Sequence, residues 1–284
     1  MSQHAKGLVI TALAMLVITP DALLIRLIDT DPWTLAFWRG VLSAVGLLVA
    51  LAVIYRGRFL AAMIAPGIPG LWIGTLFGVA AVAFVWAITH TTAANTLLIL
   101  ATGSMFGAAF SWWLLREPLP MRTALAMVGS AVGVVIIVGG DIGGGSLDGD
   151  LSALALAAIC GLTYTLIRKH AVTDMVPTAA FAGIVTAVIA ALVSVPVAVP
   201  SGDLGWLLVM GLVMLPLGFG LQFIGARYIP APEVSLLFLL EAVIGPLLVW
   251  AVVHEYPGET TFIGGAVILM TLALHAAWSL RGLR

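Results

Sequence analysis

The chain contains an internal duplication, and this feature restricts its fold more than any other. Residues 87–117 (AITHTTAANTLLILATGSMFGAAFSWWLLRE) align without a gap on residues 225–255 (GARYIPAPEVSLLFLLEAVIGPLLVWAVVHE), and the offset is 138 residues. Residues 24–26 align on residues 166–168 at an offset of 142. The chain is therefore predicted to consist of two related halves, a plan that many secondary transporters use around a central site.

Composition places both halves in a membrane. Hydrophobic residues make up 62% of the chain and charged residues 9%, and the mean hydropathy is +1.18. A water-soluble domain could not cover its surface with so few polar residues. Because lipid tolerates no open backbone, apolar runs of about 20 residues must be helices, so we expect an all-α polytopic membrane protein. Ten spans are predicted, at about 6–27, 32–55, 69–89, 92–115, 120–139, 150–169, 176–198, 203–227, 231–253 and 258–280.

The distribution of basic residues predicts the orientation, since Lys and Arg are retained on the cytoplasmic side. With the amino terminus inside, only Arg26 and Arg39 fall toward the other face. The inside segments then hold Lys6, Arg56, Arg58, Arg116, Arg122, Arg168, Lys169, Arg227, Arg281 and Arg284. Both termini are expected in the cytoplasm. The span that begins after Lys6 resembles a signal peptide, but its removal would delete the first member of the repeat, so we expect it to be retained.

The charge pattern also predicts that the two halves are inverted. Arg116 and Glu117 end the fourth span inside, whereas their counterparts His254 and Glu255 end the ninth span outside, where the fixed positive charge is gone. Similar sequence with opposite charge bias is expected of antiparallel repeats. We predict a first five-helix repeat over residues 1–140 and a second, inverted one over residues 150–284. The connector, residues 141–149, is flexible, and its acidic residues, with the adjoining Asp150, are expected to face outward; they are Asp141, Asp148 and Asp150.

No pattern of an enzyme or of a nucleic-acid-binding protein is present. The histidines are scattered without the spacing of metal ligands, and neither a Gly-x-Ser-x-Gly elbow nor a phosphate-binding glycine loop occurs. The single cysteine, Cys160, lies in an apolar run, so a thiol mechanism is not expected. A formal net charge of −1 does not favour nucleic acid. We therefore expect no catalytic residue, metal or cofactor, and no ATP site within this chain.

Glu241 lies near the middle of the predicted ninth span. A charge at this depth is costly and is a functional candidate by default. Its carboxylate could contact a substrate ammonium or carry a proton, or it could be a structural group bonded to a neighbouring helix. The counterpart in the first half is Gly103, so the repeat itself does not require an acid here.

Asp21 and Arg39 are the other charged residues at membrane depth. Asp21 follows Thr19 and Pro20, and proline removes a backbone hydrogen bond, which predicts a break in the first span. Both side chains are expected about 6 Å from the midplane, at 1.5 Å per residue from the span centres. An Asp21–Arg39 ion pair is therefore predicted, either as an external gate or as a structural pair.

Three further polar or aromatic residues are weaker candidates. Asn95 lies near the outer end of the fourth span and Gln222 in the inner half of the eighth, and amides at such positions often join two helices. Trp86 is on the third span, close to Asn95 in the hairpin; a place in the core or in the interfacial belt is the alternative.

The repeated segments resemble those of the EamA-type drug/metabolite transporters. The resemblance rests on WWLLREPLP with MVGSAVGVVIIVGG, on residues 225–255 with FIGGAVILM, and on PWTLAFWR at residues 32–39, and it covers essentially the whole chain. It implies ten helices in two inverted repeats and a central cavity lined mainly by the first, third, fourth, sixth, eighth and ninth. Carried over to this chain, the residues on these helices are Asp21, Trp86, Asn95, Tyr164, Gln222, Phe238 and Glu241.

One departure from that resemblance affects the ninth helix. Many members have Glu-Pro where this chain has Glu241 followed by Ala242, so a straighter helix is expected.

Within that family the chain is most similar to bacterial amino-acid exporters, including those for aromatic amino acids. The resemblance implies export by alternating access from a multi-pass protein of the bacterial inner membrane. A zwitterion needs partners of both signs, which Arg39, Asp21 and Glu241 could supply beside aromatic faces. Efflux of drugs or nucleobases by proton antiport, and a non-transporting scaffold or channel, remain alternatives. The expected partners are a small-molecule substrate and membrane lipid, and the duplicated chain is expected to act as a monomer.

Overall fold

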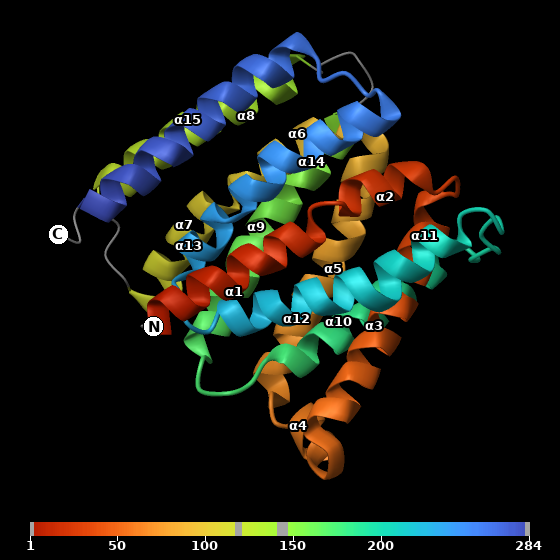
Figure 1. Cartoon of the computed structure of the whole chain (residues 1–284). Coiled ribbons are helices and arrows are strands. Elements are labelled where there is room, and N and C mark those ends of the chain that lie inside the picture. The colour runs from red at the N-terminus through yellow and green to blue at the C-terminus, as the bar shows by residue number, and fades with distance from the viewer. Residues whose placement is uncertain (1–2, 117–120, 141–146, 282–284) are drawn as a thin grey trace.

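A computed structural model describes residues 3–116, 121–140 and 147–281, and all regular structure in these ranges is helical (Figure 1). Glu117 and Asp141 therefore lie outside the described residues. The elements of the first half are α1 (Gln3–Ile18), α2 (Asp21–Leu27), α3 (Pro32–Tyr55), the 3₁₀ turn η1 (Arg56–Arg58), α4 (Phe59–Ile64), α5 (Gly67–His90), α6 (Ala93–Ala101), α7 (Gly103–Leu115) and α8 (Met121–Gly140). Those of the second half are α9 (Leu147–Lys169), α10 (Val176–Val193), α11 (Leu204–Leu208), the π-helical η2 (Val209–Met214), α12 (Leu215–Gly225), α13 (Ala231–Leu236), α14 (Phe238–Val253) and α15 (Glu259–Arg281).

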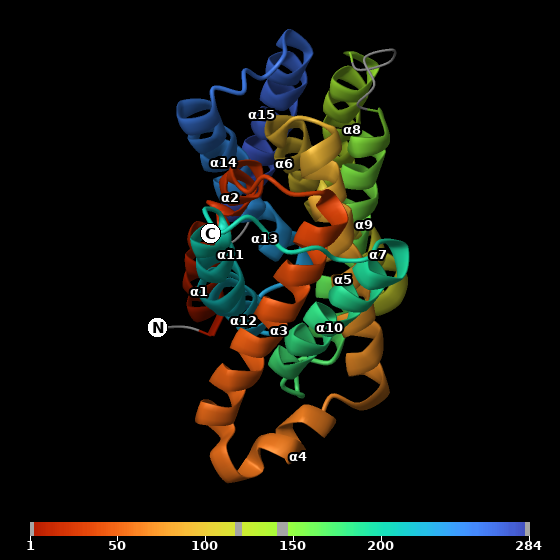
Figure 2. The ribbon, with the colours of Figure 1, turned by 90° about the vertical axis from the view of Figure 1, so that its right-hand side faces the viewer.

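The helices confirm an all-helical, multi-pass membrane protein. Within the described ranges, seven helical stretches are long and apolar enough to cross a bilayer. Three further apolar stretches are shorter, at residues 124–140, 238–253 and 259–271. The total of ten spans therefore stays a prediction. Figure 2 shows these helices along the length of the bundle, with α4 at one end and α6, α8, α14 and α15 toward the other.

The packing of the helices has two-fold symmetry between the halves. Three neighbouring pairs consist of a helix and its own counterpart: α3 with α10, α8 with α15, and the α6–α7 segment with α13–α14. Two other pairs, α1 with α12 and α5 with α9, exchange when the halves are exchanged. The pair of α8 and α15 runs along one edge of the molecule, beside α6 and α7 (Figure 1). The central contacts are therefore made between the halves, so a cavity at the centre is lined by residues of both.

Hydrogen bonds show that counterpart helices run in opposite directions. Arg26, at the end of α2, reaches Thr91, and Thr91 bonds Asp150 in the first turn of α9, the counterpart of α1–α2. Similarly, α6 begins at Ala93 beside Glu255, which follows the end of α14. The halves are thus inverted. We call the end of the bundle that holds Arg26 the Arg26 end, and the opposite end, which holds Arg168, the Arg168 end.

Three spans are interrupted near the middle of the bundle. The first breaks between α1 and α2 at Thr19 and Pro20, as the proline predicts. The fourth breaks at Thr102, between α6 and α7. The expectation of a straighter ninth helix is wrong, because α13 ends at Leu236 and α14 starts at Phe238. Around the break the backbone tightens to bonds between residues three apart, such as the 3.1 Å bond from the Leu240 N–H to the Leu237 carbonyl.

Several element boundaries also differ from the predictions. The seventh helix ends at Val193 rather than near 198, because Pro196 and Pro200 follow and cannot continue it. The second continues past Tyr55 through a bend at Arg56, where φ is +47°, into α4. The sixth begins at Leu147, inside the predicted connector. As a result Asp148 is exposed, whereas Asp150, in the first turn of α9, is fully buried. That both residues lie on the outer side of the membrane stays a prediction.

The start of α3 is capped by an acidic side chain. Asp31 accepts hydrogen bonds of 3.0 Å from the backbone N–H groups of Trp33 and Thr34, and Pro32 occupies the first helical position. Burial acts to raise the pKa of the Asp31 carboxyl, but the hydrogen bonds from Thr34 and Trp33 prevail and lower it. This cap fixes where α3 begins and thereby the depth of Arg39, two turns further along.

A close contact between two glycines positions the second and seventh spans. A Cβ atom added at Gly40 of α3 would meet the Gly183 carbonyl oxygen at 2.6 Å, and one added at Gly183 of α10 would meet the Gly40 oxygen at 2.7 Å. Only glycines permit this approach without a shift of one helix. The contact holds α3 against α10 one residue away from Arg39.

Candidate functional site

A small cavity lies at the centre of the bundle, between the two halves. Its volume is about 50 Å³. The side chains around it come from α1, α2, α3, α5 and α6 of the first half and from α9, α12 and α14 of the second. They are Ile18, Asp21, Arg39, Phe77, Ala80, Ala81, Phe84, Leu100, Leu156, Cys160, Tyr164, Phe219, Gln222, Phe238 and Glu241. The breaks in the first, fourth and ninth spans place Asp21, Leu100 and Phe238 at its wall.

The predicted Asp21–Arg39 ion pair is confirmed. An Arg39 Nη2 proton is donated to Asp21 Oδ2, and the side chains of Arg39 and Asp21 are only 4% and 1% exposed, respectively. The guanidinium also lies over the Phe84 ring, 5.2 Å from its centroid. Two atoms of the pair are buried without a hydrogen-bond partner, Asp21 Oδ1 and Arg39 Nη1. The pair is therefore neutral as a unit but incompletely satisfied, which leaves one acceptor and one donor available at the cavity.

Glu241 contributes a second carboxyl group to the cavity. It lies in the first turn of α14 and is 2% exposed. Among the described residues, no hydrogen bond or ion pair reaches its carboxylate. Gln222 of α12 lines the same cavity, and its Oε1 is also buried without a partner. Because an unpaired buried polar group is costly, these groups indicate a site that is completed by a ligand or a proton.

Aromatic rings form much of the remaining wall. Phe77 of α5 packs edge to face against Phe219 of α12, with ring centroids 4.9 Å apart. On the other side, Tyr164 of α9 lies 5.9 Å from Phe238 of α14. The first contact joins the two halves, and the second joins α9 to α14 within the second half. The wall thus combines apolar ring faces with charged groups, the combination that suits a ligand with an apolar body and a polar end.

Six of the eight residues singled out in the sequence meet at this cavity, and the other two lie elsewhere. Trp86 is not among the lining residues; its ring stacks on His90 at 3.7 Å and tilts against Trp33 at 5.2 Å. Asn95 is also absent from the lining and accepts a 2.6 Å hydrogen bond from Thr261 of α15. The cavity residues are Asp21, Arg39, Tyr164, Gln222, Phe238 and Glu241.

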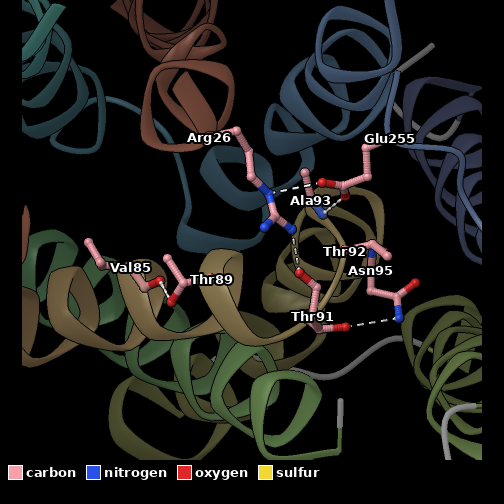
Figure 3. Close-up of polar contacts among 8 residues, drawn as sticks. All are labelled: Arg26, Val85, Thr89, Thr91, Thr92, Ala93, Asn95 and Glu255. Atoms are coloured by element: carbon pink, nitrogen blue, oxygen red, sulfur yellow. Dashed lines mark hydrogen bonds and ion pairs between the residues drawn. The ribbon is translucent and has the colours of Figure 1, made fainter. Parts of the chain in front are cut away.

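At the Arg26 end, a network of polar side chains joins four spans (Figure 3). Arg26 Nε lies 2.9 Å from Glu255 Oε2, and its Nη2 donates a 2.7 Å hydrogen bond to the Thr91 carbonyl. Glu255 Oε1 accepts a 2.7 Å bond from the Ala93 N–H, at the start of α6, where the helix dipole favours an anion. Arg26 and Glu255 are still 24% and 20% exposed, so this network faces water as well as protein.

Behind that ion pair lies a buried layer of the same network. Asp150 Oδ1 accepts a 2.7 Å hydrogen bond from the Thr91 hydroxyl and a 3.3 Å bond from the Asn95 amide. Asn95 in turn accepts from Thr261, so the end of α5 and the helices α6, α9 and α15 are linked through four side chains. These bonds close the Arg26 end above the cavity.

The Arg168 end is closed by an analogous set of contacts. Arg168 donates a 3.3 Å hydrogen bond from Nη1 to the Arg227 carbonyl, in the turn between α12 and α13. This contact corresponds to that of Arg26 with the turn between α5 and α6. Arg227 donates from Nε to the Ala171 carbonyl at 3.1 Å and lies 3.7 Å from Asp174, which also accepts from the Tyr55 hydroxyl. Both ends of the bundle are therefore held by arginines in this state.

Arg26, Glu255 and Asp150 were not predicted to form a cluster. The available signal was the duplication, which aligns Arg26 on Arg168 and Glu255 on Glu117 and so marks both ends of the repeat. Asp150 gave no such signal, because its position in an acidic, glycine-rich segment is typical of an exposed loop. Its burial depends on Thr91 and Asn95, which are more than fifty residues away in the chain.

Comparisons with known proteins agree with the repeat and the fold. The EamA-like transporter family matches residues 5–139 and 147–276, one match in each half. Fourteen chains of solved structures match this one; one of them superimposes with a TM-score of 0.73 at 20% identity, over 97% of this chain and 98% of its own. No curated protein matches the sequence. Because the family matches nearly the whole chain in two consecutive copies, this protein belongs to the EamA-like transporter family.

Proposed function

We propose that this membrane transporter exports amino acids, aromatic ones included, by alternating access around the central cavity. The observation that carries the proposal is the cavity itself, which lies between inverted halves and combines both signs of charge with aromatic walls. An amino acid requires such a combination, since its ammonium and carboxylate groups need opposite partners. The substrate-contacting residues in this proposal are Asp21, Arg39, Tyr164, Gln222, Phe238 and Glu241.

The state described by the structure fits a step of such a cycle between two open states. Ligand sites usually measure about 300–1,000 Å³, whereas this cavity measures about 50 Å³. By the space that one water occupies, it holds roughly three to five waters. A substrate can enter only if the spans separate at one end. The Arg26 network and the Arg168 contacts are the polar interactions that such a movement has to break.

The orientation in the membrane belongs to the same proposal. Because most of the basic side chains that the structure describes lie at the Arg168 end, the positive-inside rule places that end and both termini in the cytoplasm. The Arg26 end then faces outward from a bacterial inner membrane. The duplicated chain supplies both halves of the cavity, so a monomer is sufficient for transport.

Counterflow in proteoliposomes tests the proposal directly. Purified protein is reconstituted, vesicles are loaded with an unlabelled amino acid, and entry of labelled phenylalanine, tryptophan, threonine or methionine is followed. Saturable entry that rises with the unlabelled amino acid inside is the expected result. Linear entry without trans-stimulation indicates a channel, and no entry of any amino acid, with vesicle orientation controlled, refutes the proposed substrates.

Efflux of cationic compounds by proton antiport is the second candidate, and Glu241 is the observation that favours it. An unpaired buried carboxyl group could exchange a proton for a cation. Under this alternative, an imposed pH gradient should drive uptake of a labelled cation, and Glu241→Gln should abolish the drive. For an amino-acid exchanger the same substitution alters selectivity more than the maximal rate.

A further inference from the structure

We infer that the cavity recognises its substrate primarily through an ammonium group and not through a carboxylate. The side chains of Glu241 and Gln222 bind this ammonium group. This inference rests on the proposed function and extends it to the order in which related compounds bind. It states which functional group of the substrate is required for binding in the cavity.

The charges around the cavity are not balanced by the protein. The lining side chains with formal charges are Asp21, Arg39 and Glu241. Arg39 is already bonded to Asp21, so that pair is neutral. Among the lining residues, Glu241 then remains as the one acid without an ion pair, because the single cation there, Arg39, is bonded to Asp21. The complement of this arrangement is a ligand that brings a positive charge.

The unpaired atoms agree with this balance. Gln222 Oε1 and Asp21 Oδ1 are both buried acceptors without partners at the same cavity. An ammonium group carries three donors and can bond a carboxylate and two further acceptors at once. Among the lining side chains, Arg39 Nη1 is the unpaired donor. A substrate carboxylate therefore has one group to contact.

A comparison of three related compounds shows the electrostatic consequence. With Glu241 ionised, the empty cavity has a formal charge of about −1, counted from its three charged side chains. A primary amine such as phenethylamine brings the sum to zero, and zwitterionic phenylalanine leaves it unchanged. A carboxylate without an amine, such as 3-phenylpropionate, makes it more negative in a buried site. The three share one aromatic body, so the ring contacts are held constant.

The experiment uses these compounds as competitors against labelled phenylalanine in wild-type proteoliposomes. Phenethylamine is expected to compete within about threefold of unlabelled phenylalanine. We expect 3-phenylpropionate to be at least about 10-fold weaker, since a charged hydrogen bond is lost and a like charge is added. In Glu241→Gln, which keeps the shape of the side chain but not its charge, the difference between the two analogues should fall by at least about 10-fold.

Glu259→Gln is the matched control, because Glu259 is an exposed glutamate at the start of α15, away from the cavity. It should keep the wild-type order. The same ligands are also compared by the change in unfolding temperature that they cause in the purified wild-type protein. This measurement detects binding without transport, and it does not depend on the folding of a variant.

The two proposals fail in different ways. If phenylalanine shows counterflow but 3-phenylpropionate competes as well as phenethylamine, the ammonium assignment is overturned and amino-acid export stands. If no amino acid is transported but phenethylamine stabilises the protein and 3-phenylpropionate does not, export of amino acids fails and the ammonium assignment stands. Equal thermal shifts from both analogues, or a larger shift from the acid, contradict the assignment whatever is transported.

Discussion

Removing the Arg39 guanidinium is expected to destabilise the protein more than removing the Asp21 charge, although the two side chains form one ion pair. Arg39→Met leaves two acids, Asp21 and Glu241, at a buried cavity without a cation. Asp21→Asn leaves the guanidinium beside Glu241, with which it already interacts electrostatically. In Asp21→Asn, the Arg39 guanidinium still has Glu241 as an acidic neighbour. In Arg39→Met, Asp21 and Glu241 have no cation among the residues that line the cavity.

The magnitudes follow from the burial of the pair. Loss of one partner of a buried ion pair costs about 3–5 kcal/mol when the other is left uncompensated, and we expect this range for Arg39→Met. For Asp21→Asn the loss should be about 1–3 kcal/mol, the cost of one charged hydrogen bond. The double variant should be less destabilised than the sum, because it removes both charges together.

The assay is the free energy of unfolding in mixed micelles, from titration with a denaturing detergent followed by tryptophan fluorescence. Arg58→Met is the matched control, since Arg58 is exposed in the η1 turn and should change stability by less than about 0.5 kcal/mol. The reasoning is refuted if Asp21→Asn costs as much as Arg39→Met, or if the two single losses add in the double variant.

Three further predictions concern the ends and contacts of the bundle. Arg26→Gln should raise the rate at which Cys160, the sole cysteine, reacts with an impermeant thiol reagent added from outside, by about 5–30-fold if the network contributes about 1–2 kcal/mol to closure; an unchanged rate would show that the pair does not hold that end. Gly183→Ala should cost about 1–3 kcal/mol by separating α3 from α10, measured as a lower unfolding temperature, whereas Gly202→Ala, which meets nothing within 4 Å, should be neutral. Asn95→Leu should cost about 1–3 kcal/mol through its lost bonds to α9 and α15 but leave the competition order unchanged, and a changed order would place Asn95 in the binding site.

Much of the cavity was predictable because membrane burial makes polar residues informative. A charged side chain in the middle of an apolar span has few acceptable positions, so Asp21, Arg39 and Glu241 could be selected by depth alone. Asn95 and Trp86 were candidates as a polar and an aromatic residue on helices expected to line the cavity, yet they lie in the network above the cavity and in a ring stack. Depth and helix number do not specify the rotation of a helix about its axis, which decides whether a side chain faces the cavity or the neighbouring span.

Local features of the sequence determined the class of protein. Hydropathy along the chain requires membrane helices, since no other structure satisfies the backbone in lipid. The duplication and the placement of Arg and Lys predicted two inverted halves, and Pro20 predicted the break in the first span. Each of these properties is set by neighbouring residues or by a repeat that can be read directly.

Tertiary structure decided what depends on residues far apart in the chain. The break before Phe238 has no proline to mark it and arises where α13 and α14 pack against different partners, α7 and α6. Asp150 is buried because Thr91 and Asn95 donate to it, and Arg26 meets Glu255, which lies near the opposite end of the sequence. The sequence alone determined that buried charges must have partners. Only the packing of the helices decided which partners these are, because a contact depends on the distance between two helices and on the rotation of each. Neither quantity is specified by a single segment of the sequence.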